Sequence, residues 1–588
     1  MKGSLFEQSL TIALISTLLV ACGGGGGSTS DSGSSATYNA LELNGTWVSN
    51  CYFDDGVYTI DQFTFSDSAA EISYRSYNDS TCSGAAVDQD SLEPTYTLGR
   101  AVRTTSGHNA VEIDYNIVHQ GDTFTVYDLI SQSDDTFYYG QPTDTPVRPR
   151  DIDMDIVMAK QPWTLETVSE DGNWAQLPQV AMDPNGNAMV IWTQYDGSYY
   201  NLMLKVYSAA DGQWSSPVRI NTTPGNVDYS DVVFDHQGNA MVIWEQDPIN
   251  SSDSDIWAIR YNATAASWGV AEKIESQIRR SERPIAAVDS EGNVVVVWTQ
   301  TEFGSNYENI WGNRYDATTE RWSAEFSITT GHRSTFGPHI AMDEAGNALV
   351  VFAKNVTIYS SVMTSRYDVD TDTWTAPQLL ENSDAGGVSL PKVTMDRYGN
   401  GFAIWSQSPT FDSRSMVFVR RYDDDSGTWA SPEVIDSDVG YSRSPTISFD
   451  NEGNALALWV QKGASGSNVW SNYYNATTDS WGQEVMLENN TNISDSVIRF
   501  PTVSFYDNGD AIAVWKQGVP QNHEFWQNQF DASTGSWAGP EFIESSKEYN
   551  ELGVQVASAA KGQAILAWYQ RNGVTSNSRV RVKFYEGL

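Results

Sequence analysis

The chain of 588 residues is too long for one ordinary domain, and its 21 Trp residues and 12% aromatic content are typical of a folded protein. Its formal net charge is -41, with only 34 Lys and Arg residues. Nucleic acid is therefore excluded as a partner, because its phosphates would be repelled. The acidity indicates a solvated surface, with a specific cation-binding role as the alternative. We expect several domains or one large repeat array.

Residues 1–21 have the pattern of a signal peptide. The apolar run 10–20 follows Lys2 and is too short to span a bilayer as a resident helix. It ends in Leu19-Val20-Ala21-Cys22, which resembles the bacterial lipobox. The resemblance implies cleavage before Cys22 and acylation of that residue, palmitate included, which anchors the protein to a membrane. An ordinary signal peptide with a chance cysteine is the alternative.

Residues 22–37 are predicted to be a flexible tether, because they are rich in Gly and Ser and cannot form a core. Gly23 at the second mature position resembles lipoproteins sorted to the outer membrane, facing the periplasm or the cell surface. In that oxidising compartment the two remaining cysteines, Cys51 and Cys82, are expected to form a disulfide bond. The bond would contribute roughly 3 kcal/mol.

Residues 38–160 are expected to form a small all-β domain, because short alternating apolar segments are separated by turn residues. The predicted strands include 45–48, 57–65, 71–77, 95–102, 111–118 and 124–130. The opening Gly45-Thr46-Trp47 resembles the start of lipocalin-like barrels. The resemblance implies a β-barrel in which Trp47 closes one end.

From Trp163 to the end, a unit of about 53 residues recurs, which is typical of propellers and solenoids. Each unit contains a glycine followed six residues later by an aromatic residue. The glycines are Gly186, Gly238, Gly292, Gly346, Gly399, Gly453, Gly509 and Gly562. In six units an Asp stands three residues before the glycine, which predicts a hairpin between the first two strands. A third strand and a fourth strand opened by Trp complete a four-stranded blade.

The ends of the repeat region predict how the ring closes. Eight fourth-strand Trp residues occur, but the first, Trp163, precedes the first glycine, and the last unit ends after its third strand. Residues 163–168 should therefore complete the last blade beside residues 580–585. The predicted fold class is all-β: a small N-terminal β-barrel-like domain, then a closed eight-bladed β-propeller over residues 161–588. A seven-bladed propeller is the alternative.

The period and the Trp-Ser-x-Pro fourth strand, as in Trp214-Ser215-Ser216-Pro217, resemble sialidase-like propeller repeats. The Asp-box of sialidases is not reproduced at its spacing, so sialidase chemistry is not implied. The aromatic residue of each second strand, and the Gln found two residues later in seven units, are interpreted as packing. A lectin-like reading, with one sugar stacked on each aromatic, is the alternative.

Function is expected in the loops that differ between units and that emerge on one face. Tyr199, Tyr200, Phe303 and Tyr307 are predicted to form an aromatic binding surface. Four arginines stand just before first strands: Arg283, Arg333, Arg443 and Arg499. We expect them to converge at the channel mouth and to bind carboxylate or sulfate by bidentate pairing. Local pairing with Asp or Glu is the alternative.

Catalytic signals are weak. Six His residues are scattered without ligand spacing, and no Gly-x-Ser-x-Gly motif or Cys/His pair occurs. We therefore predict no catalytic residue, no metal and no cofactor, although Glu245, Glu302 and Glu308 are of the residue type that cleaves glycosidic bonds. The Asp-rich stretch 368–372 resembles a calcium loop but aligns with the hairpin turns of other units, which favours a turn.

The sequence thus favours a monomeric, membrane-anchored binding or adhesion scaffold for glycan or protein ligands. A propeller-type glycan hydrolase or lyase is the first alternative and a cell-envelope assembly factor the second. Carboxylates that converge with Arg at the channel mouth would favour the enzyme. A shallow aromatic face would favour binding.

Overall fold

A computed structural model shows an all-β protein, without an α-helix among the residues it describes, so the predicted class is confirmed. The described residues are 45–49, 52–54, 57–66, 69–77, 88–92, 94–104, 109–119, 122–133, 136–139, 158–160, 163–169, 174–249, 251, 253–276, 279–301, 307–356, 359–382, 386–408, 414–436, 440–462, 466–488, 498–519, 522–546, 554–559, 562–571 and 578–585. In this part of the chain no helix is long and apolar enough to cross a membrane. Cys22, Cys51, Cys82 and Phe303 lie outside the described residues. Two compact units divide between Leu165 and Glu166.

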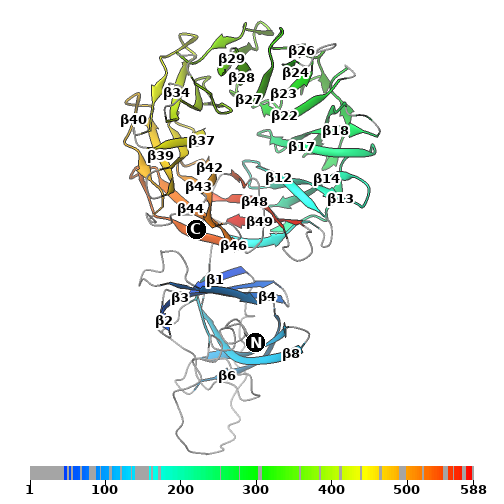
Figure 1. Cartoon of the computed structure of the whole chain (residues 1–588). Coiled ribbons are helices and arrows are strands. Elements are labelled where there is room, and N and C mark those ends of the chain that lie inside the picture. The colour runs from blue at the N-terminus through cyan, green and yellow to red at the C-terminus, as the bar shows by residue number, and fades with distance from the viewer. Residues whose placement is uncertain are drawn as a thin grey trace, which may run out of the picture. The chain divides into compact units, whose positions relative to one another are not determined.

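The first unit is one antiparallel sheet (Figure 1). Its strands are β1 (Gly45–Ser49), β2 (Tyr52–Asp54), β3 (Val57–Ser66), β4 (Ala69–Tyr77), β5 (Asp88–Leu92), β6 (Thr95–Arg103), β7 (Asn109–His119), β8 (Asp122–Ser133), β9 (Thr136–Tyr139) and β10 (Met158–Lys160). Their order is β2-β3-β1-β10-β9-β8-β7-β6-β4-β5, and β3 also pairs with β4. Every second residue of β7 faces the core, as in a half-buried strand. Trp47 is fully buried in that core with Phe63 and Ile113, as predicted.

The second unit contains, within its described residues, eight sheets of one pattern. The first strands are β12 (Ala175–Met182), β17 (Gly225–Phe234), β22 (Ser281–Val288), β27 (Thr335–Met342), β32 (Lys392–Met395), β37 (Tyr441–Phe449), β42 (Arg499–Phe505) and β47 (Gln555–Ser558). The second strands are β13 (Ala188–Tyr195), β18 (Ala240–Pro248), β23 (Val294–Thr301), β28 (Ala348–Asn355), β33 (Gly401–Gln407), β38 (Ala455–Lys462), β43 (Ala511–Val519) and β48 (Ala564–Arg571). The third strands are β14 (Tyr200–Ser208), β19 (Asp255–Asn262), β24 (Glu308–Asp316), β29 (Ser360–Asp368), β34 (Met416–Asp423), β39 (Ser467–Asn475), β44 (Asn522–Asp531) and β49 (Ser578–Tyr585).

The fourth strand, predicted as one piece, is two short pieces in seven sheets. The pieces are β15 (Gln213–Trp214) and β16 (Val218–Arg219), β20 (Ser267–Trp268) and β21 (Glu272–Lys273), β25 (Arg321–Trp322) and β26 (Phe326–Ser327), β30 (Thr373–Trp374) and β31 (Gln378–Leu379), β35 (Thr428–Trp429) and β36 (Glu433–Val434), β40 (Ser480–Trp481) and β41 (Val485–Met486), and β45 (Ser536–Trp537) and β46 (Glu541–Ser546). In the first sheet Pro217 lies in the break. Proline has no N–H to donate to the ladder and is confined to such edges.

The second strands form the core of the unit. In β13 the run Ala188–Gln194 is buried throughout, because each sheet is covered on both faces, and such strands read as continuous apolar runs. Trp192 donates its Nε1–H to Gln194 Oε1 at 2.9 Å, and five other sheets repeat this bond. All the second-strand aromatics are buried. They are packing residues, and the lectin-like alternative is wrong for them because no sugar can stack on a buried ring.

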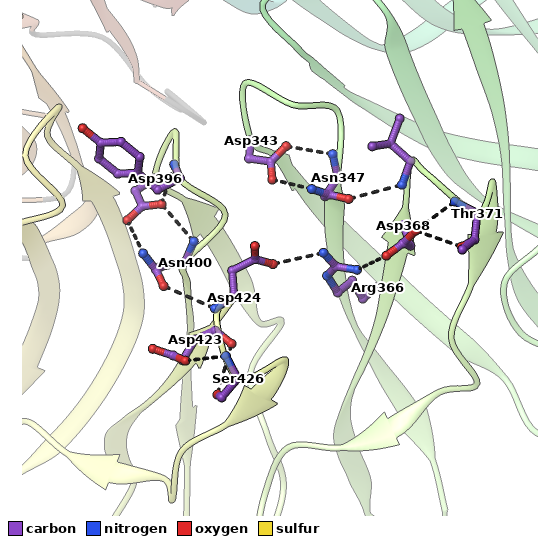
Figure 2. Close-up of polar contacts among 12 residues, drawn as sticks. Asp343, Asn347, Arg366, Asp368, Thr371, Asp396, Asn400, Asp423, Asp424 and Ser426 are labelled. Atoms are coloured by element: carbon purple, nitrogen blue, oxygen red, sulfur yellow. Dashed lines mark hydrogen bonds and ion pairs between the residues drawn. The ribbon is translucent and has the colours of Figure 1, made fainter.

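The Asp hairpins at the other end of the strands are also as predicted. Asp396 Oδ1 accepts the backbone N–H groups of Tyr398 and Asn400, both at 2.9 Å, and Oδ2 accepts the Asn400 amide at 2.9 Å (Figure 2). Gly399 between them has a φ of 96°, which glycine adopts without strain. Asn400 Oδ1 in turn accepts the backbone N–H of Asp424 and so ties the hairpin to the next turn.

Neighbouring sheets are joined on this hairpin face. Arg366 forms ion pairs with Asp368 of its own sheet at 2.9 Å and with Asp424 of the next sheet at 3.0 Å (Figure 2). Asp368 also accepts the N–H and the hydroxyl of Thr371, both at 2.9 Å, so the stretch that resembles a calcium loop is a turn.

The first strands contact one another in chain order, from β12 to β47, and β12 also contacts β47. The sheets lie around a central ring of these strands (Figure 1). At the junction of the last and first sheets, β11 (Trp163–Thr167) pairs with β49, the pairing that the sequence predicted. Val168 donates its N–H to Val580 O at 3.1 Å, and Val580 donates its N–H to Ser169 Oγ at 2.8 Å.

Gly292→Ala tests how tightly adjacent sheets pack. A Cβ at Gly292 would lie 2.7 Å from Asp235 Oδ2, an atom already held by Asn239. Gly535→Ala is the matched control, because Gly535 also has a positive φ but nothing within 4 Å of its Cβ position. We expect Gly292→Ala to lower the free energy of unfolding by about 1–3 kcal/mol more than the control. Equal losses in denaturant titrations would contradict this packing.

Candidate functional site

One position of the repeat, neutral in most sheets, carries a buried carboxylate in one of them, which indicates a functional site. The residue after the second-strand aromatic is Glu245 in the second sheet. In the other sheets, in order, it is Thr193, Thr299, Ala353, Ser406, Val460, Lys516 and Tyr569. Glu245 is the only carboxylate of this set and is only 4% exposed. Burying a carboxylate is costly, so its presence at one of eight equivalent positions marks a candidate site.

The neighbouring sheet holds the Glu245 carboxylate. Its Oε2 accepts the backbone N–H of Arg283 at 2.9 Å. Arg283 lies in a bulge of β22, where the register shifts between Glu282 and Ile285, and its φ is 54°. A bulge re-aims the backbone groups beside it. First strands of other sheets have the same bulge, for example at Leu177. What distinguishes this pair of sheets is the Glu245 carboxylate that accepts the N–H of the bulge residue.

The surroundings of Glu245 raise its pKa to about 7. Burial is the largest cause, and the charges of Glu282 and Asp228 act in the same direction, whereas the N–H of Arg283 lowers the pKa. A carboxyl group of this pKa is present in both protonation states near neutral pH. It can therefore give up or take a proton, as general acid–base catalysis requires.

Four further carboxylates of the second and third sheets act on Glu245 or on its neighbour Glu282 by their charges, and we call the five residues the acidic cluster: Asp228, Glu245, Asp247, Glu282 and Glu308. Burial raises the pKa of Asp228, Asp247 and Glu308, and the charge of Glu282 raises the last two further. Arg280 forms an ion pair with Glu282 at 2.5 Å. No group of three or more potential ligands in the described residues has the arrangement that a metal ion needs.

Cationic and aromatic groups border the acidic cluster. The Arg283 guanidinium lies 5.1 Å from the ring centre of Tyr229, whose side chain is 43% exposed. Arg280 and Arg283 both lower the pKa of Glu308 by their charge. The next residue toward the loop, Tyr307, is 41% exposed and lies against His332, with 6.1 Å between ring centres. Exposed rings of this kind offer flat apolar surfaces beside the carboxylates.

The four predicted arginines do not lie at equivalent register positions. Arg443 and Arg499 share a register, opposite Val460 and Lys516. Arg283 lies one residue later, in the bulge, and joins the acidic cluster. Arg333 lies before β27 and donates to the Val356 carbonyl after β28. The sequence carries this difference, because Arg283 directly precedes Pro284, whereas one residue separates Arg443 from Pro445 and Arg499 from Pro501.

The predicted aromatic residues also lie in different sheets. Tyr199 and Tyr200 are half-buried in the first sheet, where the Tyr200 ring lies 5.2 Å from the ring of Tyr195. Tyr307 belongs to the third sheet, and Phe303 lies outside the described residues. The sheet of β17–β21 lies between the two sets in chain order.

Sequence reasoning picked out Glu245 and Glu308 as residue types but missed Asp228, Tyr229 and Asp247. A signal for Glu245 was present, because an alignment of the eight units on their aromatics shows one Glu among neutral residues and one Lys. Asp228, Tyr229 and Asp247 belong to the second sheet, and the packing of β17 against β22 brings them beside Glu282 and Arg283 of the third sheet.

The similarity of this chain to known proteins is low. No family model matches the chain, and no curated protein matches it. Among solved structures, a polysaccharide lyase of family PL25, an ulvan lyase bound to -[GlcA(1-4)Rha3S]-, is 8% identical, covers 72% of this chain and 96% of its own, and has a TM-score of 0.42. The Dos1 propeller is 10% identical over 73% and 95%, with a TM-score of 0.41. The NanB sialidase of Streptococcus pneumoniae is 10% identical over 92% and 93%, with a TM-score of 0.31.

Glu245→Gln should change how stability depends on pH. A carboxyl whose pKa rises from 4.5 to about 7 on folding is protonated in both states below pH 4.5, so it carries no penalty there. The penalty grows as pH rises through the folded pKa, to about 3 kcal/mol. We expect Glu245→Gln to gain stability over the wild type between pH 5 and pH 8 in urea titrations. Glu272→Gln, which removes an exposed carboxylate of the same sheet, is the control, and equal pH profiles for both variants would contradict the assignment.

Proposed function

We propose that this protein is a carbohydrate-active enzyme in which Glu245 is the general acid–base residue. The observation that carries the proposal is the buried Glu245 carboxyl, whose pKa is raised to about 7 beside other carboxylates. Cleavage of a glycosidic bond needs one protonated and one ionised carboxyl group on either side of that bond. The acidic cluster supplies both kinds of group, and the exposed rings of Tyr229 and Tyr307 supply stacking surfaces for sugars.

The residues take complementary roles in this proposal. Protonated Glu245 donates its proton to the glycosidic oxygen as that bond breaks. Asp228 or Glu282, whose charges raise the pKa of Glu245, serves as the ionised partner that activates water or attacks the sugar. The backbone N–H of Arg283 holds Glu245 in place through the cycle.

We further propose that the second unit is a closed eight-bladed β-propeller and the first a small β-barrel. Support for the ring comes from the contacts between successive first strands and from the pairing of β11 with β49. Support for the barrel comes from the second pairing of β3. The ring brings the loops after second strands and before first strands to one rim. An experimental map with β11 apart from β49, or with another number of blades, would contradict it.

A second candidate function is ligand binding without turnover, as a scaffold for glycan or protein ligands. The half-buried pair Tyr195 and Tyr200, with ring centres 5.2 Å apart, favours it, because such pairs are found at sites that hold ligands by stacking. The same variants separate the two functions, since a scaffold binds glycan and releases it unchanged.

Glu245→Gln is predicted to lower turnover at least about 100-fold on any glycan that the wild type cleaves. Gln keeps the acceptor for the N–H of Arg283 but cannot donate the proton of a carboxylic acid. Wild-type activity should fall as pH rises above about 7, where Glu245 loses its proton. Chromatography of products from a glycan panel measures both effects, with Glu272→Gln as control. Unchanged turnover in Glu245→Gln would refute the assignment, and binding without products would favour the scaffold.

We propose that Cys22 anchors the protein to the outer membrane as a monomeric lipoprotein. The support is the lipobox-like Leu19-Val20-Ala21-Cys22 behind an apolar run. Cys22→Ser should abolish incorporation of labelled palmitate and move the protein from the membrane to the soluble fraction, because the acyl chains supply the membrane affinity. A Cys51→Ser variant is the control, and labelling that persists in Cys22→Ser would exclude this anchor.

A further inference from the structure

A basic pair lies on the same rim as the acidic cluster. Arg443 on β37 and Arg499 on β42 occupy the same register position in adjacent sheets. Arg443 donates an Nη2–H to Ile498 O at 3.2 Å and to Ser467 Oγ at 3.5 Å, which fixes its guanidinium between the sheets. Burial and the charge of Arg499 lower the pKa of Arg443, so the two guanidiniums lie close enough to repel.

This pair is unusual in so acidic a chain. Six other arginines of the second unit form ion pairs with carboxylates: Arg219, Arg260, Arg280, Arg314, Arg366 and Arg421. Among the described residues, neither Arg443 nor Arg499 has a carboxylate within ion-pair distance. The residue opposite Arg499 is Lys516, whose side chain is buried and which occupies the repeat position that Glu245 occupies in the second sheet. Arg443 and Arg499 therefore occupy the position that Glu282 occupies in the third sheet, and Lys516 occupies the position of Glu245 in the second sheet.

The two groups of charge lie on different sides of the ring. The acidic cluster lies on the second and third sheets, around β17 and β22, and the basic pair lies on β37 and β42, across the ring from them (Figure 1). Asp228 and Glu282 lie near the starts of their first strands, as Arg443 and Arg499 do, so the two groups share one rim. A negatively charged group of a ligand is repelled by the ionised carboxylates of the cluster and attracted by the guanidiniums.

We propose that Arg443 and Arg499 form an anion-binding subsite for the sulfate or carboxylate groups of an acidic glycan. Each guanidinium presents a planar fork of donors that matches such oxyanions. The subsite orients the glycan so that its charged group lies at the basic pair and an uncharged part faces Glu245. The orientation toward Glu245 rests on the proposed function, whereas binding of the anion does not.

The test compares an Arg443→Gln/Arg499→Gln double variant with an Arg314→Gln/Arg421→Gln control, which loses the same charge from third strands where each Arg pairs with an Asp two residues on. Calorimetry gives Kd for dextran sulfate, polygalacturonate, neutral dextran and inorganic sulfate, and thermal unfolding checks each protein. We expect the first variant to bind dextran sulfate, polygalacturonate or both about 10-fold more weakly or worse, and the control to stay within about twofold of the wild type. The polyanion affected identifies the group, sulfate or carboxylate.

Three results would overturn the proposal. The first is unchanged Kd values in the Arg443→Gln/Arg499→Gln variant, and the second is an equal loss in both double variants, which indicates net charge alone. The third is inorganic sulfate binding as tightly as dextran sulfate, which indicates a site for a free anion. Loss of binding only in the Arg443→Gln/Arg499→Gln variant, with normal turnover in Glu245→Gln, supports this subsite and refutes the proposed catalysis.

Discussion

The burial of one aromatic ring per second strand, with a neighbouring sheet on each side, is the constraint on which the second unit depends. Each indole is fully buried, and in six sheets its N–H is satisfied by the Gln two residues later. A buried indole without that acceptor would leave a polar group unpaired. Because the second strands must be apolar on both faces, polar and charged side chains are confined to the strand ends. The residue after the aromatic is the first position where the repeat tolerates a charge.

Glu245 and Lys516 occupy that same position in different sheets, and Glu245 stands near the charge of Glu282 in the adjacent sheet. A buried carboxylate is tolerated in the second sheet because a backbone N–H and a raised pKa lower its cost. The site therefore belongs to pairs of sheets rather than to single repeats. One repeat supplies the charged residue, and the next supplies the bulge that binds it.

The regular part of the fold follows from the sequence, because its causes are local. Asp and Gly set the hairpin, alternation and continuous apolar runs set the strands, and the unpaired Trp163 predicts the pairing of β11 with β49. Proline alone does not set the bulge at Arg283 or the two-piece fourth strand, since the bulge of β17 and the break between β20 and β21 contain none. Arg443 and Arg499 share a position while Arg283 does not, because Glu282 holds that position in the third sheet. The gathering of Asp228, Glu245 and Glu308 depends on contacts between sheets, which the spacing within one repeat does not contain.

The pairing of β11 with β49 has a consequence for biogenesis. The Ser169 hydroxyl and the Val580 N–H are bonded across 411 positions of sequence. During synthesis β11 emerges long before its partner, so its edge stays unsatisfied until β49 has been made. Contacts between such distant segments slow folding. Maturation of the second unit must therefore await the completed chain, and a nascent chain halted before β49 presents an open edge to other strands.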